Sequence, residues 1–355
     1  MRLELEHDNL RAALARSVHD PQGSDAGLRL CGALYRFWLH RGHASEGRDW
    51  CIATLARAVD GTPTSVHLKA LHASGVLTWK LGEVSAARAS LEDALRISRI
   101  LGDRAKEARI LNNLGGIAVH QADVAAAHAC LEQAVVIHRD LGNCTLEARC
   151  LNNLSALAIS EGHFASAEAV IERALALGRM TGNRMEEANS MSHLGFLALR
   201  RGDHAAAQTL HEQALTIARE FGVREFELEE VRRLGGVAIA RHQLQEARAR
   251  LYEALAGNRE LGNQYEIAEC LDFVAMLAAE MTAYERAANL SGAADALRES
   301  IVTPRGYAER EHYDTVLAKC REALGEATNA AAIAAGRALP SDQASDAALA
   351  WLGAR

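Results

Sequence analysis

The chain has 355 residues, of which 49% are hydrophobic and 24% charged, and its formal net charge is −7 at pH 7. This composition is that of a soluble globular protein with ample apolar material for a core. The acidic balance argues against a nucleic-acid-binding protein, and no apolar stretch approaches the ~18 residues of a membrane span.

The N-terminal segment and the cysteines both point to the cytoplasm. The first six residues are acidic, where a signal peptide is basic and then apolar. The seven cysteines are odd in number and contain no CxxC pair, so we interpret them as small buried residues in a reducing compartment. The sequence therefore predicts a cytoplasmic protein without structural disulfides.

A capping helix is predicted over residues 1–27, followed by an internal repeat of 40 residues over 28–302. Glycine recurs with this period at Gly102, Gly142, Gly182, Gly222 and Gly262. Alanine recurs in two registers, at Ala87, Ala127, Ala167, Ala207, Ala247 and Ala287, and at Ala94, Ala134, Ala174, Ala214, Ala254 and Ala294. A random alanine-rich chain would not keep these registers in step over so many copies.

Each repeat unit is predicted to be a hairpin of two helices. In one copy, helix A covers residues 107–121 and helix B covers residues 124–141. Units are joined at the recurring glycines, where a helix C-terminus needs a left-handed residue. The alanines seven apart on helix B form a small-residue stripe that lets helices approach closely. Large core residues are expected at Leu111, Leu114, Leu131 and Ile137.

The last part of the chain, residues 303–355, is predicted to be a helical cap. Residues 303–306 break the repeat register, and three short helices follow, over 308–324, over 327–338 and from Ser341. Ser341 and Asp342 are typical of a helix N-cap. The alanine-rich helix from Ala327 is expected to cover the apolar face of the last repeat or to dock a second copy in a homodimer.

The repeat pattern L-x-x-L-G-x-x-A, then G-D-x-x-x-A, then L-x-x-A resembles the tetratricopeptide repeat. The 40-residue period resembles the subfamily found in LGN, kinesin light chain and MalT-like activators. This resemblance implies an all-α, right-handed superhelical solenoid of about seven helix hairpins, beginning near Leu28, Leu68, Ala108, Ala148, Ala188, Leu228 and Ala268.

A second resemblance concerns bacterial STAND-type NTPase transcriptional regulators of the AfsR-like and LuxR-type groups. It rests on residues 6–14 (EHDNLRAAL), 37–48, 285–294 and 323–339. The chain has no GxxxxGK[ST] loop of such an NTPase. The resemblance implies either an excised sensor domain or a stand-alone relative, working with an attached or separate NTPase or DNA-binding effector.

The resemblance to tetratricopeptide arrays implies that helix A lines a concave ligand-binding groove. Positions 2, 6, 9 and 13 of each unit share one face of this helix. The groove is predicted to be basic in the first four units and acidic in the last two. The candidate ligand-binding residues on this face are Arg29, Lys69, Arg109, Asn113, Arg149, Asn153, Asn189, His193, Arg200 and Arg233.

The pairs Arg109–Asn113 and Arg149–Asn153 resemble the arginine and asparagine that LGN-type repeats present to a peptide. Asparagine can donate to and accept from a peptide backbone, and arginine binds a carboxylate with two hydrogen bonds. We therefore expect the acidic part of a peptide over units two to four. The alternative is that these charges form only a solvated helix face. Phe196, Phe273 and Met276 are expected to project into the groove or to cover helix ends.

No catalytic, metal or cofactor site is predicted. Histidines are abundant, but no HExxH or other metal-ligand spacing occurs, and no GxSxG motif is present. Cys144 and Cys150 flank a helix start, where a reactive thiol or simple packing are both compatible with the sequence.

The leading hypothesis is thus a non-enzymatic regulatory module that binds a protein or peptide. A stand-alone scaffold that joins partner proteins is the alternative, and a Rap-like phosphatase is a weaker one.

Overall fold

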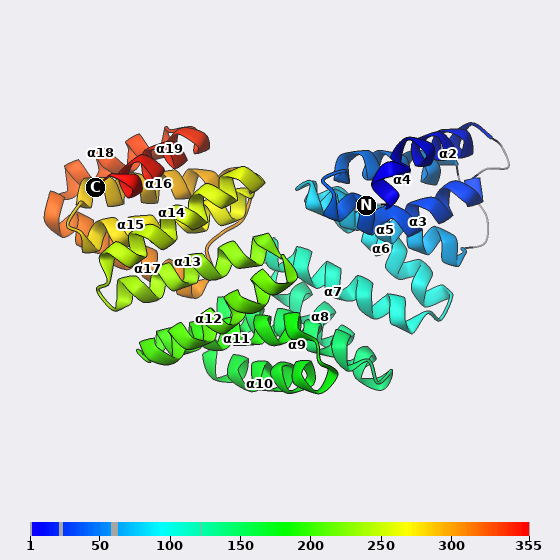
Figure 1. The fold of residues 1–355 in the computed structure, drawn as a ribbon, viewed down its shortest axis with the longest axis horizontal. Coiled ribbons are helices and arrows are strands. Elements are labelled where there is room, and N and C mark those ends of the chain that lie inside the picture. Colours follow the sequence, from blue (N-terminus) through cyan, green and yellow to red (C-terminus); the bar gives the residue numbers. More distant parts are fainter. Residues whose placement is uncertain (1, 21–23, 58–62, 122, 355) are drawn as a thin grey trace. The chain divides into compact units, whose positions relative to one another are not determined.

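The fold is all-α, as predicted. In the computed structural model, residues 2–20, 24–57, 63–121 and 123–354 are described, and this part of the chain contains nineteen helices and no strand (Figure 1). None of the described helices is both long enough and apolar enough to cross a bilayer.

The helices follow one another in a regular succession of hairpins. The N-terminal helices α1 (Arg2–Leu5) and α2 (His7–His19) precede seven hairpins, and three helices follow these. The hairpins are α3 (Ser24–His40) with α4 (Ala44–Arg57), α5 (Ser65–Lys80) with α6 (Val84–Ile100), α7 (Arg104–His120) with α8 (Val124–Asp140), α9 (Cys144–Ser160) with α10 (Phe164–Thr181), α11 (Arg184–Arg200) with α12 (His204–Phe221), α13 (Arg224–Ala240) with α14 (Leu244–Leu261), and α15 (Gln264–Glu280) with α16 (Tyr284–Ser300).

The chain divides into two compact units. Unit 1 comprises Met1–Val119 and Asp123–Leu146, and unit 2 comprises His120–Ala122 and Glu147–Arg355. The main boundary falls in the first turn of α9. We describe each unit by itself below.

Both units are built on the small-residue stripe of helix B. All twelve alanines of the two predicted registers, from Ala87 to Ala294, have no exposed surface. Large residues fill the space between the hairpins, including the predicted Leu111, Leu114, Leu131 and Ile137. In unit 1, helix glycines allow further close approach, since Gly115 lies directly against Leu131 of α8. The sequence pattern therefore predicted the core because burial follows the repeat register.

The turns within and between hairpins use left-handed residues, as the repeating glycines indicate. Gly102, Gly142, Gly182, Gly222 and Gly262 have φ of 65° to 66°. The turns inside the hairpins adopt the same conformation at Gly82, Gly162 and Gly202. In the last two hairpins this position is taken by His242 (φ 56°) and Thr282 (φ 60°), which pay a steric cost there. The predicted turn residue Ala122 lies outside the described residues.

Three helices follow the repeats: α17 (Tyr307–Leu324), α18 (Glu326–Arg337) and α19 (Ser341–Gly353). The alanine-rich α18 packs on α16, which confirms that it covers the last hairpin. The approach is close, because Gly336 lies against the backbone of Asn289 and Gly292 against that of Ile333. The predicted N-cap at Ser341 is wrong. Pro340 precedes the helix and no side chain caps it, while the Ser341 carbonyl accepts a hydrogen bond from Ser345.

All seven cysteines are free, and five of them are buried. Burial raises the pKa of the Cys150 thiol to about 12, which favours packing over reactivity at that position. Cys144 is half-buried in the first turn of α9.

Candidate functional site

Unit 1 contains a basic pocket on the helix-A side of its hairpins. Its volume is about 480 Å³, and α3, α5 and α7 contribute its walls. It is lined by Arg29, Gly32, Ala33, Tyr35, Ser65, Val66, Lys69, His72 and Lys106. Three of these described lining residues are cationic at neutral pH and none is a carboxylate. The pocket therefore has the charge of an anion-binding site.

Each cation reaches the pocket from a different helix. Arg29 on α3 lies at the rim, where it pairs with Asp25 one turn earlier at 2.6 Å. Lys69 on α5 is exposed, and its Cβ packs closely on Gly32 of α3. Lys106 is in the first turn of α7. The N-terminal turn of α5, at Ser65 and Val66, adds the positive end of a helix dipole to the same wall.

Lys106 carries the mark of its cationic neighbours. Burial lowers the pKa of the Lys106 ammonium, and repulsion from Arg109 and Lys69 lowers it further, whereas Tyr35 and Asp103 raise it. A carboxylate in the pocket would relieve this repulsion and raise the pKa of Lys106 again.

A polar pair, of which His72 is buried and Asn113 is half-buried, supports the floor of the pocket. Asn113 of α7 lies 3.1 Å from Nε2 of His72 on α5, and the Tyr35 ring meets the His72 ring edge-on, with the ring centroids 5.7 Å apart. Burial lowers the pKa of His72 to about 3, and Arg109 and Lys106 contribute to this shift. His72 is therefore a neutral structural residue at physiological pH.

The structure brings four of the predicted groove residues together in unit 1. Arg29 and Lys69 line the pocket. Arg109 and Asn113 do not line it but interact with residues that do, Arg109 electrostatically with Lys106 and Asn113 by a contact with His72. The sequence reasoning missed Lys106, Tyr35 and His72. Lys106 was missed because helix A was predicted to begin at residue 107, whereas α7 begins at Arg104 and adds most of one turn to the basic face.

The predicted cations of unit 2 are paired with carboxylates instead. Arg149 binds Glu186 at 2.8 Å, and Arg233 binds Glu229 at 2.6 Å. Arg200 binds Glu311 of α17.

The polar candidates of unit 2 are half-buried among other residues. His193 lies 2.9 Å from the Ser155 hydroxyl, and burial lowers its pKa to about 4. Asn153 and Asn189 are half-buried on α9 and α11.

Helix α17 lies along the helix-A side of unit 2. Gly306 packs on Ser160 at the end of α9, and Tyr307 packs on Gly162. Arg305 pairs with Asp272 of α15 at 2.7 Å. Four helices therefore share one polar interface, whose members include Arg200–Glu311, Lys319–Glu280 and Arg298–Glu269.

The apolar residues expected in the groove are half-buried and packed rather than free. Phe196 stacks with Phe164 at a centroid distance of 6.5 Å, and Arg232 lies over the Phe273 ring at 5.1 Å. Met276 packs on the core of the last hairpins. This packing argues against apolar side chains that project freely into a groove, and the alternative that they cover helix ends stays a prediction.

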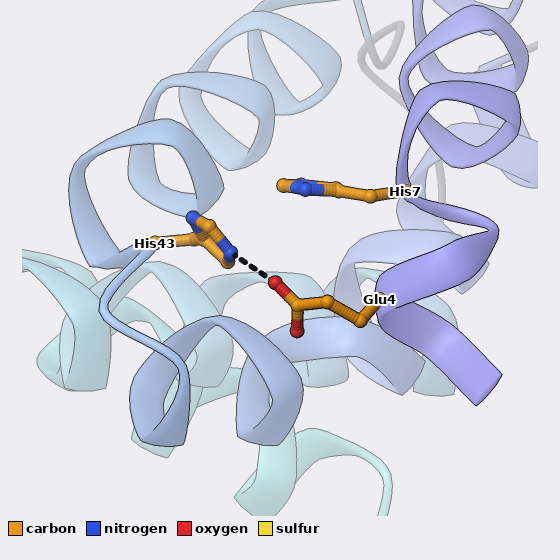
Figure 2. Close-up of side chains that lie close together, drawn as sticks. All are labelled: Glu4, His7 and His43. Atoms are coloured by element: carbon orange, nitrogen blue, oxygen red, sulfur yellow. Dashed lines mark hydrogen bonds and ion pairs between the residues drawn. The ribbon is translucent and has the colours of Figure 1, made fainter. Parts of the chain in front are cut away.

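One further cluster of side chains forms outside the basic pocket. Glu4, His7 and His43 converge at the N-terminal end of unit 1, as Figure 2 shows. Their ligand atoms, one from each residue, all lie within 4.8 Å of one another. No metal-ligand group was expected because only histidines close together in sequence were compared. His7 and His43 are far apart in sequence, so this comparison could not find them.

Comparisons with known proteins agree with the repeat architecture. Residues 106–180 and 146–220 match the tetratricopeptide repeat family. No curated protein matches the sequence.

Solved structures share the fold at low sequence identity. The Rap conjugation gene regulator of plasmid pLS20, in complex with the Phr* peptide, matches with a TM-score of 0.60 and 13% identity over 88% of this chain and 80% of that one. A Rap protein complexed with competence and sporulation factor gives 0.57 and 13% over 90% of this chain and 100% of that one. BtubC from P. vanneervenii gives 0.51 and 21% over 62% of this chain and 93% of that one. The chain is thus a solenoid of tetratricopeptide-like hairpins that carries tetratricopeptide repeats within residues 106–220.

Proposed function

We propose that this chain is a non-enzymatic binding module, and that the basic pocket of unit 1 binds an acidic group of a peptide or partner protein. The observation that carries the proposal is the convergence of Arg29, Lys69 and Lys106 on one cavity whose described lining residues include no carboxylate. Arg29 pairs with Asp25 at the rim, whereas carboxylates neutralise all three predicted arginines of unit 2, namely Arg149, Arg200 and Arg233.

The chemistry of the pocket suits a carboxylate side chain. The two lysines provide compact ammonium charges, and Arg29 adds a planar fork at the rim. Tyr35 and Val66 supply apolar wall for the carbon stem of an aspartate or glutamate. The cavity is large enough for one or two residues of an extended peptide. It lies on the first three A helices, one unit earlier than the sequence indicated.

Two of the solved structures with this fold are complexes. One is a Rap protein with the Phr* peptide, and the other is a Rap protein with competence and sporulation factor. They support a peptide as the ligand class. We infer further that occupancy regulates a bacterial signalling or transcription effector, attached or separate. Because each hairpin contacts only its neighbours, small rotations between hairpins would accumulate along the repeats.

The test is a charge reversal in the pocket. Fluorescently labelled peptides containing alternating glutamates, with matched glutamine peptides, are titrated with the wild type and with Lys69→Glu/Lys106→Glu. The control is Arg96→Glu/Arg99→Glu, which changes the charge equally on helix B of the same unit. We expect a glutamate peptide to bind the wild type and the control, and to bind the pocket variant at least ~10-fold more weakly.

Equal affinity for the glutamine peptides, or for the pocket variant, would overturn the assignment. A sensor is distinguished from a rigid scaffold by small-angle scattering with and without the bound peptide. A ligand-dependent change in scattering supports regulation, and identical profiles support a scaffold.

A further inference from the structure

The cluster of Glu4, His7 and His43 joins two parts of unit 1 that are distant in sequence. Oε1 of Glu4 lies 3.2 Å from Nε2 of His43, and the two imidazole centroids are 4.4 Å apart. Figure 2 shows both rings and the carboxylate directed toward a common point. The N-terminal helices thereby meet the turn between α3 and α4.

The backbone holds all three residues in place. Glu4 on α1 and His7 at the start of α2 are three residues apart, so both side chains project on the same side. His43 follows Gly42, whose φ of 77° reverses the chain, and the N–H of His43 donates to the Trp38 carbonyl. The site is thus built on short, ordered segments.

The surroundings leave donor atoms available. Phe37 packs edge-on against His7, with ring centroids 5.3 Å apart, and shields the cluster on one side. Nε2 of His7 is buried and has no hydrogen-bond partner among the described residues, although Glu46 Oε1 lies 3.3 Å away. Arg11 holds Glu46 through two hydrogen bonds of 2.7 Å. An unsatisfied buried ring nitrogen is costly unless it binds something.

Charge around the cluster is compatible with a divalent cation. Arg41 lies 3.6 Å from Oε2 of Glu4, so Oε1 is the oxygen that faces the imidazoles.

We propose that Glu4, His7 and His43 bind a divalent transition-metal ion of the Zn²⁺ class and fasten α1 and α2 to the first hairpin. Two histidines and one carboxylate are a donor set that Zn²⁺ takes at ~2.0–2.1 Å, with water as a fourth ligand. Such bonds place neighbouring donors ~3.3 Å apart, which the Glu4–His43 pair already matches. The ligand atom of His7 lies within 4.8 Å of the other two, and a change in its side-chain torsions brings it closer. The ion enters past Glu4, which is exposed.

The experiment uses the full chain without a polyhistidine tag. Zn²⁺ binding is measured by calorimetry, and Co²⁺ binding by the visible absorption of a low-symmetry site. His7→Gln and His43→Gln remove one ligand each, and the matched control is His19→Gln, an exposed histidine on the same helix α2. Circular dichroism verifies that each variant is folded.

We expect one metal ion per wild-type chain, with affinity reduced at least ~10-fold in both ligand variants and unchanged in the control. Zn²⁺ should raise the Tm of the wild type and of His19→Gln, but not of His43→Gln. Absence of binding to the wild type would overturn the proposal. So would equal binding to His43→Gln, because the ion would then be held elsewhere, for example by the cysteine thiols.

Discussion

The two units use the same repeat register but leave their helix-A faces in different electrostatic states. In unit 1, Lys69 and Lys106 face a cavity whose described lining contains only positive charge. In unit 2, arginines such as Arg149 and Arg233 are paired with glutamates on the next hairpin or on the same helix. Where neighbouring helix-A faces carry charge of one sign, that charge is available to a ligand of opposite sign. Where they carry both signs, the side chains neutralise one another by ion pairing.

The units also differ in what covers this face. In unit 2, α17 crosses the ends of α9, α11 and α15 and extends the ion-pair network through Glu311 and Lys319. Burial and the nearby Glu269 raise the pKa of Glu309 to about 7. Unit 1 has its pocket on the corresponding face. We therefore propose that ligand binding belongs to unit 1 and that the charges of unit 2 are structural. The tryptophans can test this proposal, since Trp38, Trp50 and Trp79 belong to unit 1 and Trp351 to unit 2.

The largest effect is expected from Arg298→Ala. Arg298 is 3% exposed and pairs with Glu269 and Asp272, so its loss removes one cation from a buried network in which Arg232 still contacts Glu269 and Arg305 still contacts Asp272. Breaking a buried pair in this way costs about 3–5 kcal/mol. Urea unfolding of a fluorotryptophan-labelled protein, followed by fluorine NMR, should show Trp351 unfolding first. The control Arg250→Ala breaks a surface pair with Glu246 and should cost less than about 1 kcal/mol. Equal effects of the two changes would contradict the structural role.

The next effect concerns the close approach of α18 to α16. In Gly336→Ala the new Cβ would lie 1.8 Å from the Asn289 carbonyl oxygen, which is backbone and cannot move aside. We expect a loss of about 3 kcal/mol from overpacking, although alanine in a helix is normally better than glycine by about 1 kcal/mol. Denaturant unfolding measures this loss. Gly353→Ala, where Tyr252 is 3.6 Å away, is the matched control and should not destabilise. A stabilised Gly336→Ala protein would show that α18 is not held against α16.

The third effect is a pH dependence in unit 1. The pKa of His72 is about 3 in the folded chain and ~6.5 when unfolded, so below pH 6.5 the unfolded state binds the extra proton. Stability is therefore lost as the pH falls from 6.5 toward 3, by up to about 2 kcal/mol between pH 7 and pH 5. His72→Gln should lose less over this interval, as reported by Trp79 during urea unfolding. The exposed His19→Gln variant should follow the wild type. An unchanged pH dependence in His72→Gln would mean that His72 is not held neutral.

The smallest effect concerns the left-handed turns of the last two hairpins. Thr282 has a φ of 60°, which is unfavourable for a β-branched residue. Thr282→Gly should stabilise unit 2 by about 1 kcal/mol, and His242→Gly by less. Gly202→Ala, at the same turn position, should destabilise the chain by a similar amount. Scanning calorimetry checks all three, and a lower Tm for Thr282→Gly would contradict the argument.

The sequence alone determined the repeat architecture because its physical causes are local and periodic. Alanines every 40 residues predicted the buried stripe, and glycines predicted the left-handed turns. The three C-terminal helices were predicted within one residue at nearly every end, because Pro304, Gly325 and Pro340 mark the breaks between them.

Only the tertiary structure decided which charges are available. Arg149 and Lys69 occupy the same repeat position, but Glu186 of the next hairpin neutralises Arg149, while Lys69 faces the pocket. Pairing of this kind depends on side chains from neighbouring hairpins and from α17. Glu311 of α17, for example, pairs with Arg200, which is more than 100 residues away in the sequence. The histidine cluster could not be predicted from the sequence for the same reason. Glu4 and His43 come into contact only when the N-terminal helices pack on the first hairpin.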